Sequence, residues 1–109
     1  LLGPLAGTLD APPCDLDLEP VEASATAMLS RRQAWQMRLL PLRIERGMLV
    51  VATSKANLGR AATFAWRRFA MPIDLRVADE AQLEAHLART YPWPGLREGA
   101  IERDAVGMA

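Results

Sequence analysis

The sequence predicts a small α/β (α+β) domain with a mixed sheet of about three strands, made of a hairpin plus a βαβ unit and covered by helices. Residues 38–53, RLLPLRIERGMLVVAT, hold two apolar runs separated by Glu-Arg-Gly, a pattern typical of a β-hairpin. A helical pattern and a third apolar run follow, as in a βαβ unit. The hairpin makes the first two strands antiparallel, and the right-handed crossover makes the second and third parallel.

The chain length of 109 residues indicates one domain, and the hydrophobic share of 50% allows a modest core. Because the chain begins Leu-Leu-Gly, we expect it to be a piece of a longer protein. Residues 1–14, rich in Gly, Pro and Ala, are predicted to be a linker or the tail of a preceding domain. The folded domain is predicted at 15–91 and an irregular C-terminal tail at 92–109.

Two elements are expected before the hairpin. Residues 15–19 alternate acidic and apolar side chains, which predicts a short edge strand. Ser24 or Thr26 is a suitable N-cap for a helix running to about Trp35, with its apolar positions on one face.

The first hairpin strand is predicted at Leu39–Glu45, with two sets of side chains on opposite faces: Leu40, Leu42 and Ile44 on one, Leu39, Pro41 and Arg43 on the other. Because Pro41 has no N–H to donate, it requires an edge or an irregularity. Gly47 accepts the positive φ that a short hairpin turn needs. The second strand, Met48–Thr53, is apolar on both faces and should be the most buried.

The next helix has the clearest apolar periodicity in the chain. Asn57 is its expected N-cap, and residues 70–72, Ala-Met-Pro, end it. We expect Trp66 to pack against the sheet. The apolar stripe consists of Leu58, Ala61, Ala62, Ala65 and Phe69.

A third strand is predicted at Ile73–Val77, and a last helix follows it. Asp79 is the expected N-cap of this helix, with Gln82 at the capping-box position. Its inner stripe consists of Leu83, Leu87 and Tyr91.

Charge is unevenly distributed along a chain of zero net charge: residues 1–30 carry −5, residues 31–68 carry +8 and residues 69–109 carry −3. The basic middle can receive phosphate or an acidic partner, or its charges can mix with acidic ones on a solvated surface. Two interpretations are open for the run Trp66-Arg67-Arg68. The aromatic ring can stack on a base while the arginines bind phosphate, or Trp66 can pack against the sheet while the arginines are solvated.

No catalytic set is present, so we expect no enzymatic activity from this chain. It has no Gly-rich phosphate loop with a Lys. Its one cysteine, Cys14, and one histidine, His86, cannot complete a zinc site of about four ligands. His86 is interpreted as a solvated helix residue. Nucleic-acid binding is not expected without a basic excess and exposed aromatics, and no apolar run is long enough to span a bilayer.

Residues 15–91 resemble the N-terminal, MshE-type domain of type II secretion and type IV pilus assembly ATPases. The resemblance is carried by the order and spacing of several short motifs rather than by any one of them. These are Arg31-Arg32, Leu40-Pro41-Leu42, Arg46-Gly47, Leu49-Val50-Val51-Ala52-Thr53, Met71-Pro72-Ile73, Ala78-Asp79-Glu80, Leu83 and Tyr91. The same domain occurs in phage-adsorption-type membrane glycosyltransferases.

The chain departs from the family pattern in two loops. Ser54-Lys55-Ala56-Asn57 stands where members usually have Asp-Pro, and Ala70 stands where a Gly is common. Cyclic di-GMP recognition in the family uses paired Arg-Leu-Gly-x-x-Leu motifs. Here Leu2-Gly3-Pro4-Leu5 lacks the Arg, and the nucleotide-binding half is missing or degenerate.

The resemblance implies a non-catalytic regulatory or docking domain of a larger protein. Its expected partner is an inner-membrane platform protein or another domain of the same protein, at the cytoplasmic face of a bacterial inner membrane. The alternative is a cyclic di-GMP sensor, with no other cofactor expected. The candidate anion or nucleotide contacts are Arg31, Arg32, Arg67 and Arg68.

Overall fold

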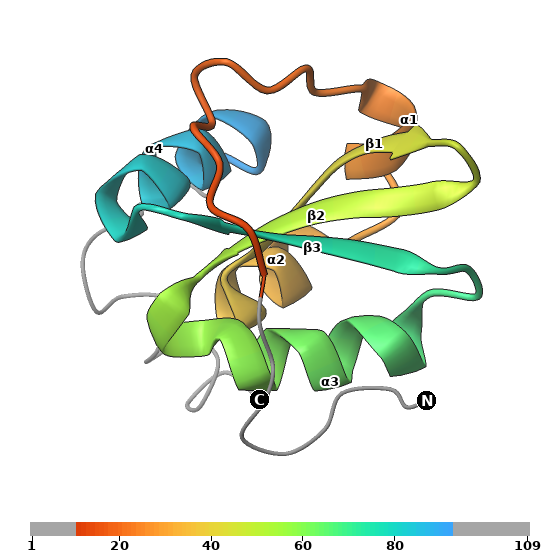
Figure 1. Cartoon of the computed structure of the whole chain (residues 1–109). Helices are drawn as coiled ribbons and strands as arrows, with labels where there is room; N and C mark the ends of the chain where they lie inside the picture. The colour runs from red at the N-terminus through yellow and green to blue at the C-terminus, as the bar shows by residue number, and fades with distance from the viewer. Residues whose placement is uncertain (1–10, 93–109) are drawn as a thin grey trace.

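The structure, a computed structural model, describes residues 11–92, and Figure 1 shows its layers. Its elements in order are α1 (Ala23–Thr26), α2 (Arg31–Met37), β1 (Leu39–Glu45), β2 (Met48–Ser54), the 3₁₀ helix η1 (Lys55–Asn57), α3 (Leu58–Arg68), β3 (Ile73–Ala78) and α4 (Glu80–Thr90). The sheet order is β1-β2-β3, with β1 antiparallel and β3 parallel to β2. This confirms the predicted fold class.

The sheet lies between two layers of helices, with α2 and α3 on one side and α4 on the other (Figure 1). The central strand β2 is buried from Leu49 to Ser54, which confirms that it is the most buried strand. Leu83 and Leu87 of α4 are fully buried, so each layer covers one apolar face of the sheet.

A bulge breaks the predicted alternation in β1. Pro41 pairs with Val51, but Arg43 pairs with Val50, so Leu42 is an extra residue in β1. Leu39, Leu40, Pro41 and Leu42 are all buried, as expected for a strand covered on both faces. The predicted alternation therefore fits the regular register from Leu39 to Pro41 and is interrupted only by the bulge after it. The requirement that Pro41 lie at an edge or an irregularity is confirmed, because β1 is an edge strand and the bulge follows Pro41.

The hairpin turn uses two residues with positive φ. Arg46 has φ 55° and Gly47 has φ 78°, the pairing of a type I′ turn. The right-handed strand twist favours this turn, and a side chain at Gly47 would adopt the left-handed region at a cost.

Gly47→Ala is expected to lower the free energy of unfolding by about 1 kcal/mol, because Ala disfavours φ 78°. Gly59→Ala is the matched control. Gly59 lies in α3, where an added methyl group would meet open space, and the substitution should stabilise the domain by about 0.5–1 kcal/mol. Urea unfolding followed by circular dichroism measures both. Equal effects of the two substitutions would contradict the turn assignment.

The single helix predicted from Ser24 or Thr26 to Trp35 is wrong, because the structure has two helices there. The Ser30 hydroxyl accepts a hydrogen bond from the Gln33 N–H at 3.1 Å, which starts a new helix at Arg31. The segment before α1 is held to β1, since the Glu22 N–H donates to the Leu42 carbonyl at 2.7 Å.

The edge strand predicted at 15–19 is also wrong, because residues 16–18 form a turn. Pairing occurs earlier, at the end of the predicted linker. The Cys14 N–H donates to the Val77 carbonyl at 2.8 Å, and the Val77 N–H donates to the Pro12 carbonyl at 2.9 Å. Since Pro12 and Pro13 have no N–H, the ladder stops after one bridge. We call residues 12–17 the strap.

Helix α3 follows its predicted stripe but not its predicted cap. Asn57 lies at the N-cap position, yet its side chain makes no capping bond and instead donates to the Ser54 hydroxyl at 2.7 Å. The Ala residues of the stripe and Phe69 are buried. Trp66 is 38% exposed, so its predicted packing against the sheet is wrong. The sheet-facing positions are taken by Ala61 and Ala65, which allow close approach of helix and sheet.

Helix α4 starts as predicted, because the Asp79 carboxylate accepts from the Gln82 N–H at 3.1 Å. The Gln82 side chain does not complete a capping box. It donates to Asp15 Oδ1 at 2.8 Å and accepts from the Leu16 N–H at 2.9 Å, so it fixes the strap instead. The inner stripe of Leu83, Leu87 and Tyr91 is buried, as predicted. The expected tail from residue 93 onward lies outside the described residues.

Candidate functional site

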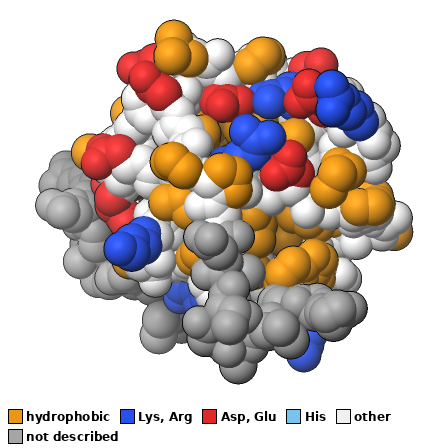
Figure 2. Space-filling view, viewed as in Figure 1, with side chains coloured by type: hydrophobic (Ala, Val, Ile, Leu, Met, Phe, Trp, Pro, Cys, Tyr) orange, Lys and Arg blue, Asp and Glu red, His pale blue; other side chains and the backbone are white. Residues whose placement is uncertain are grey.

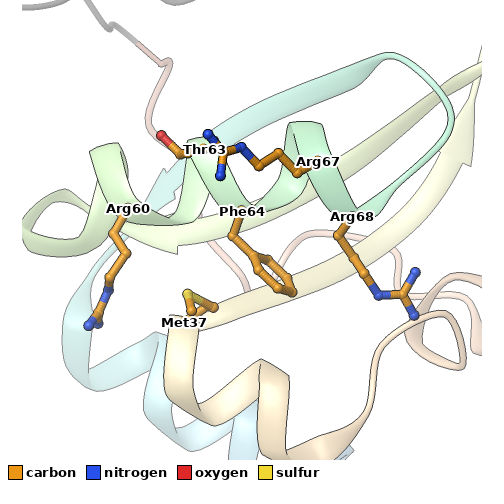
Figure 3. A pocket seen from close by; sticks show the side chains of 6 residues that line it. All are labelled: Met37, Arg60, Thr63, Phe64, Arg67 and Arg68. Carbon is orange, nitrogen blue, oxygen red and sulfur yellow. The ribbon is translucent and has the colours of Figure 1, made fainter.

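A groove of about 540 Å³ lies between α2 and α3, and we call it the α2–α3 groove. Its lining side chains combine an apolar floor with three guanidinium groups (Figure 3). They are Met37, Arg60, Thr63, Phe64, Arg67 and Arg68.

Helix periodicity in α3 places these side chains together. Arg60, Phe64 and Arg68 are four residues apart, so they lie one above another along one side of the helix. In Figure 3, the Phe64 ring points toward Met37 of α2, while Arg60 and Arg68 flank it. The result is an apolar centre with a cation at each end.

Buried contacts fix the position of α2 beside α3. The Trp35 Nε1–H donates to the Tyr91 carbonyl at 3.1 Å, and Trp35 is 4% exposed. The Tyr91 hydroxyl donates to the Thr26 carbonyl at 2.6 Å. From α3, Arg68 Nη2 donates to the Met28 carbonyl at 3.0 Å, beside the groove.

Burial raises the pKa of Tyr91 to about 12, well above the usual value for tyrosine of about 10. The folded state therefore holds this proton more tightly than the unfolded state. The stability linked to it should be complete below pH 10 and be lost as the pH rises toward 12. Tyr91 is the single tyrosine in the chain, so ultraviolet absorbance of tyrosinate reports it alone. A midpoint near 10 in the folded protein would contradict its burial.

The three groove arginines carry charge that no described carboxylate neutralises. Arg60 donates to the Asn57 amide oxygen at 2.6 Å, and Arg68 donates to a backbone carbonyl, so both contact neutral acceptors. Arg67 makes no hydrogen bond or ion pair with another described residue. The groove is therefore apolar and electropositive together.

Elsewhere the two signs of charge are mixed. Among the described residues, ion pairs join Arg38 to Glu84, Arg43 to Glu19 and Glu45, Arg76 to Asp74, and His86 to Asp17. Figure 2 shows acidic and basic side chains beside one another on the face turned to the viewer. The expectation of mixed surface charge thus fits these regions but not the α2–α3 groove.

The structure brings together two of the four predicted site residues. Arg67 and Arg68 line the groove, whereas Arg31 and Arg32 do not. Arg31 Nη1 donates to the Pro92 carbonyl at 3.2 Å, and Arg32 is exposed on the first turn of α2. A ligand role for any of the four stays a prediction.

Sequence reasoning missed Arg60, Phe64 and Met37 as groove residues. The spacing of Arg60, Phe64 and Arg68 at every fourth position was a usable signal, because it places two cations around an aromatic ring on one helix side. The contribution of Met37 had no such signal, since it depends on how α2 packs against α3.

His86 is half-buried, so its interpretation as a solvated residue is wrong. Its Nε2 lies 2.9 Å from Asp17 Oδ1, and this hydrogen bond holds the pKa of Asp17 below the usual value for an aspartate. The pair fastens the strap to α4.

Within residues 11–92, no cluster of three or more His, Cys, Asp or Glu side chains is arranged to hold a metal ion. None of the helices described has the length and apolar character needed to cross a membrane.

The model of the MshEN domain family matches residues 9–94. This range contains the strap, the sheet and both walls of the groove. The chain belongs to the MshEN domain family. The resemblance found in the sequence is thereby confirmed.

Two solved structures have a fold similar to this MshEN domain. A structure of MshE with cdg matches with a TM-score of 0.64 and 24% identity over 74% of this chain. The N-terminal domain of XpsE matches with a TM-score of 0.62 and 21% identity over 74% of this chain. The match covers 59% of the MshE chain and 58% of the XpsE chain. A sequence comparison with curated proteins finds no match.

Proposed function

We propose that this MshEN domain is a non-catalytic regulatory and docking domain of a larger bacterial secretion, pilus-assembly or membrane glycosyltransferase protein. Its partner is a cytoplasmic part of an inner-membrane platform protein or another domain of the same larger protein. Family membership supports the regulatory role. The α2–α3 groove supports the docking role, because an apolar floor beside cations that no described carboxylate neutralises is typical of a surface completed by a partner.

The test uses the isotopically labelled chain and the cytoplasmic part of the platform protein encoded with the larger protein. We expect saturable shifts of the amide NMR signals of α2 and α3 when this partner is added. We also expect the variant Phe64→Ser to lose binding. Trp66→Ser is the matched control, because Trp66 is exposed on α3 and does not line the groove. Shifts confined to other elements, or equal loss in both variants, would contradict docking at this groove.

Cyclic di-GMP is the second candidate ligand of the groove. It is favoured by the fold shared with MshE, which has a solved structure with cdg, and by three guanidinium groups near one aromatic ring. The groove volume of about 540 Å³ lies within the common range for small-molecule sites, about 300–1,000 Å³. An amide titration with cyclic di-GMP decides between the two. Saturable shifts near Arg60, Arg67 and Arg68 would support a sensor, and an unchanged spectrum at millimolar nucleotide would exclude it.

A further inference from the structure

We propose that the partner segment seated in the α2–α3 groove is an acidic amphipathic helix, with carboxylates about two turns apart and a large apolar side chain between them. This inference rests on the proposed docking function and names the chemistry of the partner. It follows from the charge of the groove, the spacing of its side chains and the helical nature of both walls.

Charge complementarity requires acidic groups on the partner. Arg60, Arg67 and Arg68 line the groove, and none of them forms an ion pair with another described residue. Other cations of the described region, such as Arg43 and Arg76, already have carboxylate partners. A basic or neutral helix would leave the groove charges uncompensated, and a basic one would be repelled.

The apolar centre requires a large hydrophobic side chain between those acids. Phe64 points toward Met37 across the groove, and both side chains are only partly buried by the domain itself (Figure 3). A Leu, Phe or Met from a partner would cover this apolar surface, and methionine adapts to the shape of such a side chain.

The spacing along α3 gives the pattern of the partner. Arg60 and Arg67 are seven residues apart and Arg60 and Arg68 eight, which is roughly 10–12 Å along a helix. Phe64 lies midway. A partner helix packed along the groove meets these positions with an acid, an apolar residue about one turn later and a second acid about two turns later.

The groove offers side chains rather than a strand edge. Its residues come from α2 and α3, whose backbone groups within the helices are bonded inside each helix. An extended peptide would find no ladder of donors and acceptors there, whereas a helix satisfies its own backbone. A helix is therefore the favoured partner conformation.

The test uses the full chain and a pair of helical peptides of equal length. The probe peptide carries Glu at two positions separated by two turns with Leu between them, and the control peptide carries Gln in place of both Glu residues. Amide titration at low salt should place the probe on α2 and α3. The control peptide, and the domain variant Arg60→Gln/Arg67→Gln, should each lower the affinity about fivefold or more.

Arg46→Gln/Arg89→Gln is the matched variant, because it removes two exposed charges that do not line the groove. This variant should leave the affinity for the probe peptide nearly unchanged. Added salt should lower the affinity of the domain for the probe peptide more than its affinity for the control peptide. Equal binding of both peptides, or shifts outside α2 and α3, would overturn the acidic-helix inference.

The outcomes separate this inference from the proposed function. If the platform protein shifts the groove signals but the Glu peptide does not, docking stands and the acidic-helix partner is rejected. If a second copy of the chain or cyclic di-GMP occupies the groove and displaces the peptide, the acidic-helix partner is rejected as well. If neither peptide nor platform protein reaches the groove, both proposals fail.

Discussion

Replacing Trp35 with alanine is expected to lower the free energy of unfolding by about 3–5 kcal/mol. Trp35 is 4% exposed, so the change removes a large buried ring and leaves a cavity in the core. It also leaves the Tyr91 carbonyl without the indole N–H that lies 3.1 Å away. Urea unfolding followed by circular dichroism measures the loss.

Trp66→Ala is the matched control for this prediction. Trp66 is 38% exposed on α3, and its removal should change stability by no more than about 0.5 kcal/mol. A Trp35→Phe variant separates the effect of lost buried volume from that of the lost hydrogen bond, because Phe keeps most of the apolar volume but has no N–H to donate. It should lower the free energy of unfolding by about 1 kcal/mol. Similar losses for Trp35→Ala and Trp66→Ala would contradict the packing of α2. Because Trp35 positions α2, its loss should also weaken binding at the groove.

Leu16→Ala is expected to lower the free energy of unfolding by about 2–5 kcal/mol. Leu16 belongs to the strap and is 1% exposed, enclosed in the core although it precedes every regular element. Its backbone N–H is also bonded to Gln82, so the side chain cannot leave without loosening the strap. Thermal unfolding and amide exchange of α4 measure the effect.

Leu18 is the matched residue, two positions later and 79% exposed. Leu18→Ala should leave stability within about 0.5 kcal/mol of the parent. If Leu16→Ala and Leu18→Ala lowered the free energy of unfolding equally, the strap would not be part of the folded core. If Leu16→Ala raised amide exchange only in the strap, its coupling to α4 through Gln82 and His86 would be rejected.

The central sheet could be predicted because its signals are local. Gly47 fixes a tight turn, the run from Leu49 to Thr53 is apolar on both faces, and Asp79 has the chemistry of an N-cap. Each of these constraints acts within a few residues, so sequence pattern carries it. The bounds of β1 agreed with the prediction for the same reason. The parallel pairing of β3 also agreed, because a right-handed crossover restricts the topology of a βαβ unit.

Residues 11–38 were less predictable because competing local preferences were nearly equal there. Ser30 within an apolar stripe can extend one helix or start another, and its contact with the Gln33 N–H decides for the second. The pattern of 15–19 suited a strand, but Pro12 and Pro13 limit pairing to one bridge, and Leu16 enters the core instead.

The candidate site was predicted in part for a related reason. Arg67 and Arg68 were visible as a basic pair beside an aromatic, but the aromatic that faces the groove is Phe64, not Trp66. Arg31 and Arg32 belong to the other wall helix and yet do not line the groove. Which side of each helix faces the other is set by packing on the sheet, and one sequence window does not contain that information.

By itself the sequence determined the relative directions of the three strands, the hairpin turn, the apolar stripes and the family to which the chain belongs. Turn chemistry and hydrophobic period act over a few residues, and they were enough for these features. Only the tertiary structure decided that the strap joins the core, that α2 is a separate helix from α1, and that the arginines of α3 and Met37 of α2 line one groove. These features depend on contacts between residues that are distant in the chain. The energies of such contacts cannot be inferred from a local sequence pattern.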